Sequence, residues 1–348
     1  SLKWETTDTK NIGFDFGLFG NHLNGNINYY INETRDLLIT RRIAPSAGLD
    51  NPTLNVGKMR NQGFELELNW NDKISDFEYN IGFNISTIAN KVVALANEDQ
   101  TIYGVGLKYG TEHFPTQTKV GKPIGAFYLY QADGIFQSLE EVQAHKNSKG
   151  ELLQPNAQPG DVRFKDMNGD GVIDEDDKTY SGTGIAKVEA NLNLGASYKG
   201  FDFSAVIGSA FGNKLYNGIR YYYEGMNSGS NFLKTTLNAW TPTNTKTDIP
   251  RAVFGDPNQN TRESTRFLEN GDFVRLRQVQ LGYTLPKALS KHIYCESIRF
   301  YVSAENVFTI TGYSGANPEF SQGVLNSGVD RFTYPFSRSY TVGAQVSF

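Results

Sequence analysis

Alternation of apolar and polar residues is the dominant pattern along this chain. Within residues 62–71 the two kinds alternate without an error, and the apolar side chains are Phe64, Leu66, Leu68 and Trp70. A period of two places successive side chains on opposite faces of a β-strand. Residues 77–86 repeat the pattern after the short segment 71–76, so the two strands are expected to form a hairpin.

The same period predicts eleven strands. In 273–283 the apolar positions change from even to odd numbers after Leu276, which is typical of a β-bulge. The strand that ends near Ala89 and the one that begins at Val188 run in opposite directions, so an even number of strands must lie between them; 124–131 is one, and 101–109 is the remaining candidate. The expected strands are 12–18, 23–31, 62–71, 77–86, 101–109, 124–131, 188–198, 201–207, 273–283, 298–304 and 340–348.

Short and long connections alternate along the chain. Short turns are expected at 20–21, 71–76 and 199–200 and a moderate one at 286–297, whereas 33–59, 132–187, 213–271 and 310–337 are long and polar. Outer-membrane barrels have short periplasmic turns and long extracellular loops. The pattern therefore predicts an all-β fold, a transmembrane antiparallel β-barrel in which 132–187 is an extracellular loop.

The strand count indicates how much of a barrel is present. Bacterial barrels have an even number of strands, and eleven strands that begin at the long-loop end do not make a complete one. Residues 1–348 are therefore expected to be the C-terminal portion of a larger, plugged barrel, with the plug domain and the signal peptide absent from this chain.

Composition changes this picture only in detail. A net charge of −4 gives no global basic field, so no nucleic-acid partner is expected. The mean hydropathy of −0.45 and the absence of long apolar runs exclude membrane-spanning helices. They do not exclude a barrel, whose mean hydropathy averages an apolar outer face with a polar lumen. Aromatic residues make up 13% of the chain, which suits strands, and the lone Cys295 excludes an intrachain disulfide. A soluble, calcium-stabilised β-sandwich that binds polysaccharide remains the alternative.

One segment carries a specific chemical motif. Residues 166–177 match a twelve-residue calcium loop, with a glycine, Gly171, at the position of the sharp turn. Position 12 is Asp177 rather than Glu, and the flanks are not the helices of an EF-hand, so a structural ion is expected rather than a sensor. The ligands would be the side chains of Asp166, Asn168, Asp170, Asp174 and Asp177 and the backbone carbonyl of Val172.

Other residues offer weaker signals. Tyr221, Tyr222, Tyr223 and Trp240 lie in a long loop, where they could contact a ligand or a partner protein, or else fix the loop's own small helix near 232–240. A second short helix is expected at 139–146. Glu65 and Glu67 share a strand face and could form a glycosidase acid pair, but such neighbours more often line a wet lumen, and no catalytic residue is expected. The histidines lie far apart, without partners at metal-ligand spacing.

The order of several short motifs resembles the SusC/RagA family of TonB-dependent outer-membrane transporters of Bacteroidetes-type bacteria. The resemblance covers nearly the whole chain, and the alternating last strand that ends in Phe348 resembles the barrel-assembly signal of such proteins. It rests on 121–128 with 132–136, Pro-Gly-Asp at 159–161, the calcium loop, Trp-Thr-Pro at 240–242, Ile-Pro-Arg at 249–251, 273–277 with 281–286, 305–308 and Asn-Pro-Glu at 317–319.

The resemblance implies a function and its partners. The expected activity is active import of oligomeric nutrients, glycans or peptides, across the outer membrane, and not catalysis. The TonB complex would supply the energy through the missing N-terminal part, and a SusD-type surface lipoprotein would cover the barrel. Outer-membrane lipid would surround the strands.

Overall fold

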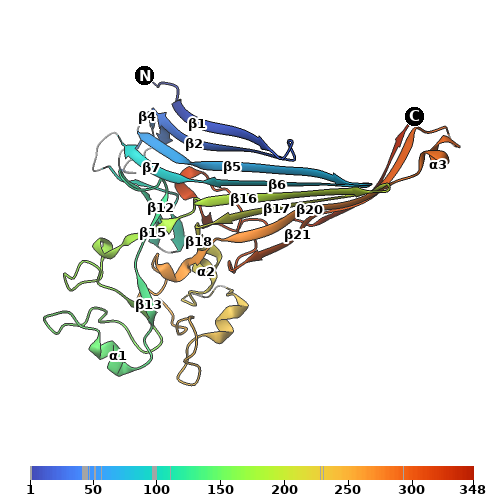
Figure 1. The fold of residues 1–348 in the computed structure, drawn as a ribbon. Coiled ribbons are helices and arrows are strands. Elements are labelled where there is room, and N and C mark those ends of the chain that lie inside the picture. Colours follow the sequence, from blue (N-terminus) through green and yellow to red (C-terminus); the bar gives the residue numbers. More distant parts are fainter. Residues whose placement is uncertain are drawn as a thin grey trace.

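The chain forms one large, curved antiparallel sheet with long connections gathered at one end (Figure 1). A computed structural model describes residues 2–40, 46, 48–50, 52–55, 57–95, 100–109, 111–227, 229, 231–292 and 294–348. The strands of the large sheet are β1 (Thr6–Leu18), β2 (Leu23–Arg35), β5 (Lys58–Ile74), β6 (Phe77–Thr87), β7 (Ala89–Ala94), β16 (Val188–Tyr198), β17 (Phe201–Phe211), β20 (Phe273–Thr284), β21 (Ser297–Thr311) and β23 (Ser339–Ser347).

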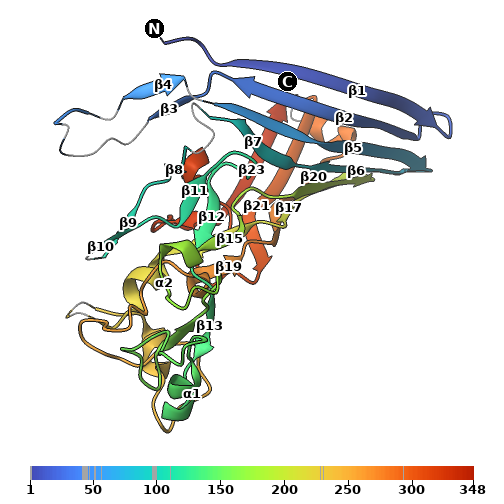
Figure 2. The same cartoon turned by 90° about the vertical axis from the view of Figure 1, so that its left-hand side faces the viewer.

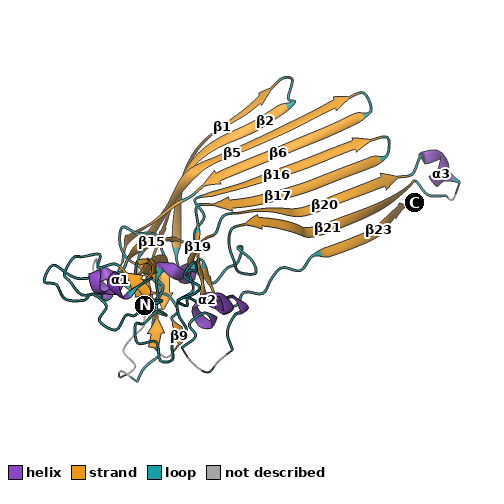
Figure 3. Ribbon diagram, turned by 90° about the horizontal axis from the view of Figure 1, so that it is seen from below, coloured by secondary structure: helices purple, strands orange, loops and turns teal. Residues whose placement is uncertain are grey.

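Short turns join neighbouring strands at the opposite end of this sheet (Figure 3). The β16–β17 turn has only two residues, Lys199 and Gly200, which both have a positive φ, as two-residue hairpin turns require. The β5–β6 turn, at residues 75–76, is shorter than predicted because β5 continues to Ile74. The predicted hairpins and the separation of short from long connections are confirmed.

The register explains the alternation in the sequence. Successive paired residues trace a row across nine strands that is apolar at every step: Leu18, Leu23, Trp70, Ile81, Leu194, Ala205, Val279, Ala304 and Tyr340. The adjacent row faces the other way and is polar or glycine except at Val206: Gly17, Asn24, Asn69, Gly82, Asn193, Val206, Gln278, Glu305 and Ser339. In these two rows one face of the sheet is apolar and the other is polar apart from Val206, as expected of a wall between lipid and water.

The apolar face is exposed. Ile12, Phe14 and Val342 leave 74%, 67% and 84% of their surface accessible, and Ile81 leaves 41%. A soluble sandwich would cover such side chains with the apolar face of a second sheet. Their exposure over the whole width of the sheet contradicts that alternative and fits contact with lipid.

Two of the eleven predicted strands are wrong. β6 pairs directly with β16 along its full length, so no strand lies between them, and zero satisfies the parity argument as well as two. The segments predicted at 101–109 and 124–131 instead form short strands of small sheets at the long-loop end. Their alternation has another cause, since Phe127 and Leu129 are fully buried among loops. The path across the large sheet contains nine strands, with β7 continuing β6 along β5.

The bulge predicted in 273–283 is confirmed. The register of β20 against β21 shifts between Leu276 and Gln278, and its register against β17 shifts opposite the same place. Against β17 the extra residue is Arg277, whereas against β21 Arg277 stands opposite two unpaired residues, Asn306 and Val307.

The remaining elements are short and, apart from α3 in the β20–β21 connection, belong to the long connections (Figure 2). Among the described residues, no helix has the length and apolar character needed to cross a bilayer. The predicted helices are found as α1 (Leu139–Ala144) and as a 3-10 helix, η3 (Lys234–Asn238). The other elements are β3 (Leu38–Thr40), β4 (Thr53–Asn55), β8 (Ile102–Tyr103), β9 (Leu107–Tyr109), β10 (Thr111–His113), β11 (Thr116–Thr118), β12 (Ala126–Leu129), β13 (Ala132–Ile135), β14 (Val162–Phe164), β15 (Thr179–Thr183), β18 (Lys214–Asn217), β19 (Leu268–Asn270), β22 (Val329–Asp330), α2 (Gly218–Tyr223), α3 (Lys287–Lys291), η2 (Glu175–Asp177), η4 (Thr265–Phe267) and η5 (Val324–Asn326).

Candidate functional site: the loop body

The long connections pack together into a loop body, defined here as the described residues of 100–187, 212–272 and 312–338. Its largest hydrophobic cluster draws on all three segments and consists of Leu107, Phe127, Leu129, Tyr216, Tyr221, Phe267 and Val329. Backbone pairing crosses the segments too, because β22 lies parallel to β18. The loops therefore share one core rather than standing as separate hairpins.

The predicted calcium loop is a compact turn at the surface of the loop body. The carboxylate of Asp166 accepts the backbone N–H groups of Gly169 and Gly171, at 2.6 and 2.9 Å. Gly171 has φ +92°, and a Cβ there would lie 2.8 Å from the amide nitrogen of Asn147, so the turn requires glycine. Asn168 and Asp170 accept N–H groups two residues ahead. Val172 lies on the exposed part of the turn.

The end of the calcium loop is fixed by Asp177, which is fully buried. Its carboxylate accepts the backbone N–H groups of Met167 and Asp174, at 2.6 and 2.8 Å, and so ties the end of the loop to its beginning. Asp174 caps the 3-10 helix η2. The six predicted ligand residues therefore share one closed turn.

The charge of this turn fits a cation. The aspartates at 166, 170, 174, 176 and 177 form no ion pair with any Lys, Arg or His that the structure describes. Among the described residues, no three His, Cys, Asp or Glu side chains already converge as metal ligands, since these carboxylates point to backbone N–H groups. The donors available are carboxylate, amide and carbonyl oxygens, the set that Ca²⁺ prefers.

The four aromatic candidates divide into two pairs. Tyr221 lies in the hydrophobic cluster, and Trp240 is 7% exposed and donates its indole N–H to Gln137, so both have the loop-packing role. Tyr222 stacks on Phe332 with ring centroids 5.5 Å apart, and Tyr223, which is 37% exposed, meets the same ring edge-on. Of the four, Tyr223 offers the most accessible aromatic surface to a ligand or partner, whereas Tyr222 is partly buried and also packs against the cluster.

Two motifs that the sequence separates by about ninety residues meet in the loop body. Arg251 of Ile-Pro-Arg forms a two-pronged ion pair with Asp161 of Pro-Gly-Asp, at 2.8 and 3.1 Å, and Asp161 is fully buried. Trp240 of Trp-Thr-Pro covers Gly160, where a Cβ would lie 2.4 Å from the indole ring. These contacts give the motifs a shared structural role, which sequence reasoning missed.

A second buried ion pair joins the same two loops. Lys178 Nζ lies 2.5 Å from Glu263 and 2.6 Å from Glu175, and His113 contacts the other oxygen of Glu263. Burial alone would raise the pKa of Glu263, but the hydrogen bond with His113 and the charge of Lys178 outweigh it and hold this pKa below its ordinary value. Burial would likewise lower the pKa of Lys178, yet its carboxylate partners raise it. Both groups of the pair are therefore charged.

Two arginines of β20 bind one carboxylate on the polar face of the sheet. Arg275 binds Asn317 at 2.6 Å and Glu319 at 2.8 Å, and the bulged Arg277 reaches the other oxygen of Glu319 at 3.0 Å. Residues 275 and 277 are two positions apart and lie on the same face of the strand, so both arginines bind one carboxylate. The motif Asn-Pro-Glu thus fastens the 312–338 segment to the barrel wall.

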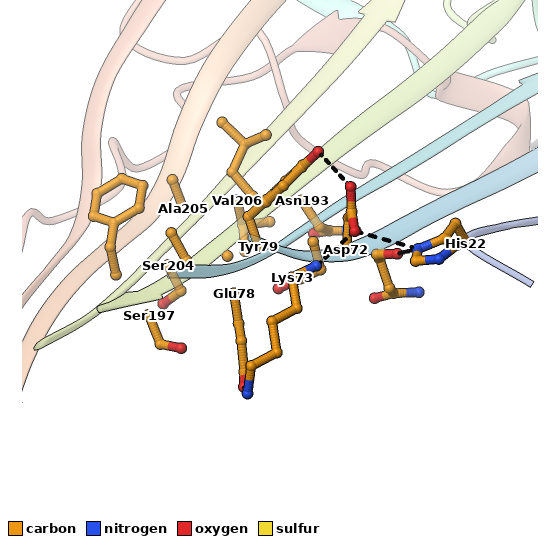
Figure 4. A pocket seen from close by; sticks show the side chains of 16 residues that line it. His22, Asp72, Lys73, Glu78, Tyr79, Asn193, Ser197, Ser204, Ala205 and Val206 are labelled. Atoms are coloured by element: carbon orange, nitrogen blue, oxygen red, sulfur yellow. Dashed lines mark hydrogen bonds and ion pairs between the residues drawn. The ribbon is translucent and has the colours of Figure 1, made fainter. Parts of the chain in front are cut away.

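Two cavities were not foreseen from the sequence. One, of about 630 Å³, lies in the loop body between α2, η3 and residues 312–316, and Arg220 on its wall binds Glu224, Asp248 and Glu269. The other, of about 710 Å³, lies near the short turns. There Asp72 links His22 to Tyr79, while Glu78 and Ser197 point to the opposite side of the ribbon (Figure 4). Glu67, one of the two acids considered for catalysis, accepts the amides of Asn26 and Asn69 on the polar face.

Comparison with known proteins agrees with this architecture. The model of the family "TonB dependent receptor-like, beta-barrel" matches residues 1–307. The whole chain is 30% identical to TonB-dependent receptor P3 of Formosa agariphila and 27% identical to TonB-dependent receptor SusC of Bacteroides thetaiotaomicron, over 34% and 32% of those proteins. The structure of the RagAB peptide transporter superposes with a TM-score of 0.78 at 26% identity, over 99% of this chain and 36% of that one. The chain thus spans about a third of the length of these relatives.

The family match, the uniform lipid-facing surface and the division into short turns and long loops lead to one assignment. The chain belongs to the TonB-dependent receptor-like β-barrel family of the outer membrane, with SusC- and RagA-type transporters among its relatives.

Proposed function

We propose that this chain is the C-terminal barrel portion of a transporter that imports oligomeric nutrients, glycans or peptides, across the outer membrane. The observation that carries the proposal is the pair of register rows, apolar on one face and polar on the other, together with the packed body of long loops at one end of the sheet. A wall of this kind separates lipid from an aqueous path. The relatives named for SusC and for peptide transport support the substrate class.

Two partners follow from the proposal. The TonB complex of the inner membrane would supply energy, and a SusD-type lipoprotein would cover the loop body. The accessible aromatic surface at Tyr222, Tyr223 and Phe332 offers a contact for that partner or for the cargo.

Uptake by cells tests the import proposal. The full-length gene would be expressed in the outer membrane of a host that lacks such importers, with its neighbouring lipoprotein, and supplied with fluorescent oligosaccharides and oligopeptides. Uptake of one class is expected, and a protonophore should abolish it because TonB draws on the inner-membrane potential. Uptake that survives the protonophore would contradict energisation by TonB, and failure to take up either class would contradict import.

We also propose that residues 166–177 hold a structural Ca²⁺ ion, bound by Asp166, Asn168, Asp170, Asp174, Asp177 and the carbonyl of Val172. Support comes from the oxygen-only donor set, the left-handed Gly171 and the five aspartates that have no cationic partner among the described residues. When bound, the ion would offset the repulsion of these carboxylates and stiffen the turn.

Metal content tests the calcium proposal. The full-length protein should bind one equivalent of Ca²⁺ at this loop after dialysis, and the double variant Asp166→Ala, Asp170→Ala should lose it. Asp176→Ala is the matched control, because Asp176 belongs to the same turn but stands at a non-ligand position. Equal calcium content in all three proteins would refute the assignment.

A further inference from the structure

The two buried ion pairs between the loops lie on either side of the calcium loop. Asp161 directly precedes β14, which leads into Asp166, and Lys178 directly follows Asp177. Their partners, Arg251 and Glu263, belong to the 212–272 segment. The calcium loop is therefore bracketed by the residues that bind it to its neighbour.

The segment 256–266 is held against the calcium loop by more than charge. The guanidinium of Arg262 stacks between the rings of Phe164 in β14 and Tyr130, at 4.6 and 4.9 Å from their centroids. The backbone of Tyr130 accepts from Thr265 at 2.9 Å and donates to Glu263 at 3.1 Å. The segment thus touches both flanks of the calcium loop without supplying any of its predicted ligands.

The Lys178–Glu263 ion pair connects the end of the calcium loop to residues 256–266. The side chain of Lys178 is 7% exposed and that of Glu263 is 5% exposed, so separating them would take an ionic partner from each of two buried groups, at a larger cost than breaking a surface pair. Without an ion, the crowded aspartates repel one another and loosen the turn that fixes Asp177. Any displacement of Asp177 passes to Lys178 through a single peptide bond.

We propose that calcium binding at 166–177 and the packing of residues 256–266 are coupled, with the Lys178–Glu263 pair as the link. The inference rests on the calcium site of the proposed function and deepens it: the ion stabilises a second loop that contributes no ligand. Coupling between two sites is reciprocal, so loosening residues 256–266 weakens calcium binding by the same factor.

Hydrogen exchange of the full-length protein, with Ca²⁺ or with a chelator, tests the link. In the unaltered protein Ca²⁺ should slow exchange in both 166–178 and 256–266. In Lys178→Met, which keeps the length of the side chain but removes its charge, Ca²⁺ should still protect 166–178 but no longer 256–266. Arg275→Met is the matched control, since Arg275 is a buried cation paired with Glu319 outside both segments; this variant should retain both effects.

Calcium affinity provides the second readout. Glu263→Gln should bind Ca²⁺ at least about five-fold more weakly, the lower end of typical coupling between sites, although Glu263 is not a ligand. Unchanged protection of 256–266 in Lys178→Met, or unchanged affinity in Glu263→Gln, overturns the coupling while leaving the calcium site standing. If Ca²⁺ fails to protect 166–178 in the unaltered protein, the calcium site and the coupling fall together.

Discussion

Placing a charge on each face of one strand tests the assignment of lipid and lumen. Ile81 and Asn80 are neighbours in β6, on the apolar and the polar face respectively. Ile81 is four residues from the strand's end at Phe77, or about 14 Å along the strand and about 10 Å in depth at a 45° tilt, which lies near the middle of an apolar band of about 25 Å. Ile81→Lys therefore places an ammonium group close to the bilayer midplane.

The expected cost follows from that depth. A lysine on the lipid face near the midplane destabilises a barrel by about 2–4 kcal/mol, equivalent to a shift of about 30- to 900-fold in the folding equilibrium. Asn80→Lys should change stability by less than about 0.5 kcal/mol, because its side chain enters the polar face. Guanidinium unfolding of the full-length protein in phospholipid vesicles measures both. Equal stabilities for the two variants would refute the assignment of faces.

Three further predictions concern the loop body and its anchor. Gly160→Ala should destabilise the protein by about 1–3 kcal/mol more than Gly134→Ala, because both glycines have a positive φ but only a Cβ at 160 would strike Trp240. Thermal unfolding compares the two variants. Equal losses of stability would show that the indole ring moves aside. Because the pKa of Glu263 is held below its ordinary value of 4.5, the stability that this carboxylate contributes should persist at pH 5 and disappear as the pH falls below 4.5 through the folded-state pKa. Hydrogen-exchange rates of residues 256–266 between pH 6 and 3.5 measure this loss. A loss already complete at pH 5.5 would contradict the prediction. Arg275→Met should speed proteolysis within 312–338 more than Arg277→Met does, since the side chain of Arg275 is 4% exposed and that of Arg277 is 39% exposed. Equal rates of proteolysis would show that the buried arginine is not the main anchor of this segment.

The strands of the wall were predictable because their signal is local. Between 62 and 71, or between 188 and 198, each residue's polarity is set by the face it occupies, and the face alternates with every residue. The bulge at Arg277 was visible for the same reason, as a change of phase within a single strand. The strands 101–109 and 124–131 were mispredicted because residues such as Phe127 are buried on every side, where alternation does not report a face.

The contacts of the loop body were beyond prediction from one sequence because they join distant residues. Nothing near Asp161 indicates Arg251, and nothing near Lys178 indicates Glu263, although each pair is now buried. The burial of Tyr221 had a local signal that was missed. Asn217 caps α2 by accepting the N–H of Arg220, and a helix that starts there turns Tyr221 inward and Tyr223 outward.

These distant contacts join several of the short motifs to other parts of the chain. Asp161 and Lys178, which flank the calcium loop, form ion pairs with Arg251 and Glu263 of the next loop. On the sheet, Arg275 binds Asn317 and Glu319, and Arg277 binds Glu319. Each motif alone is a short polar segment that could occur in any loop. Several of these segments supply the two partners of a buried ion pair, and removing one partner of such a pair destabilises a protein strongly. Substituting one member of a pair should therefore destabilise the protein even where the substituted segment alone carries no recognisable function. The motifs are thus informative about the fold when they are considered together.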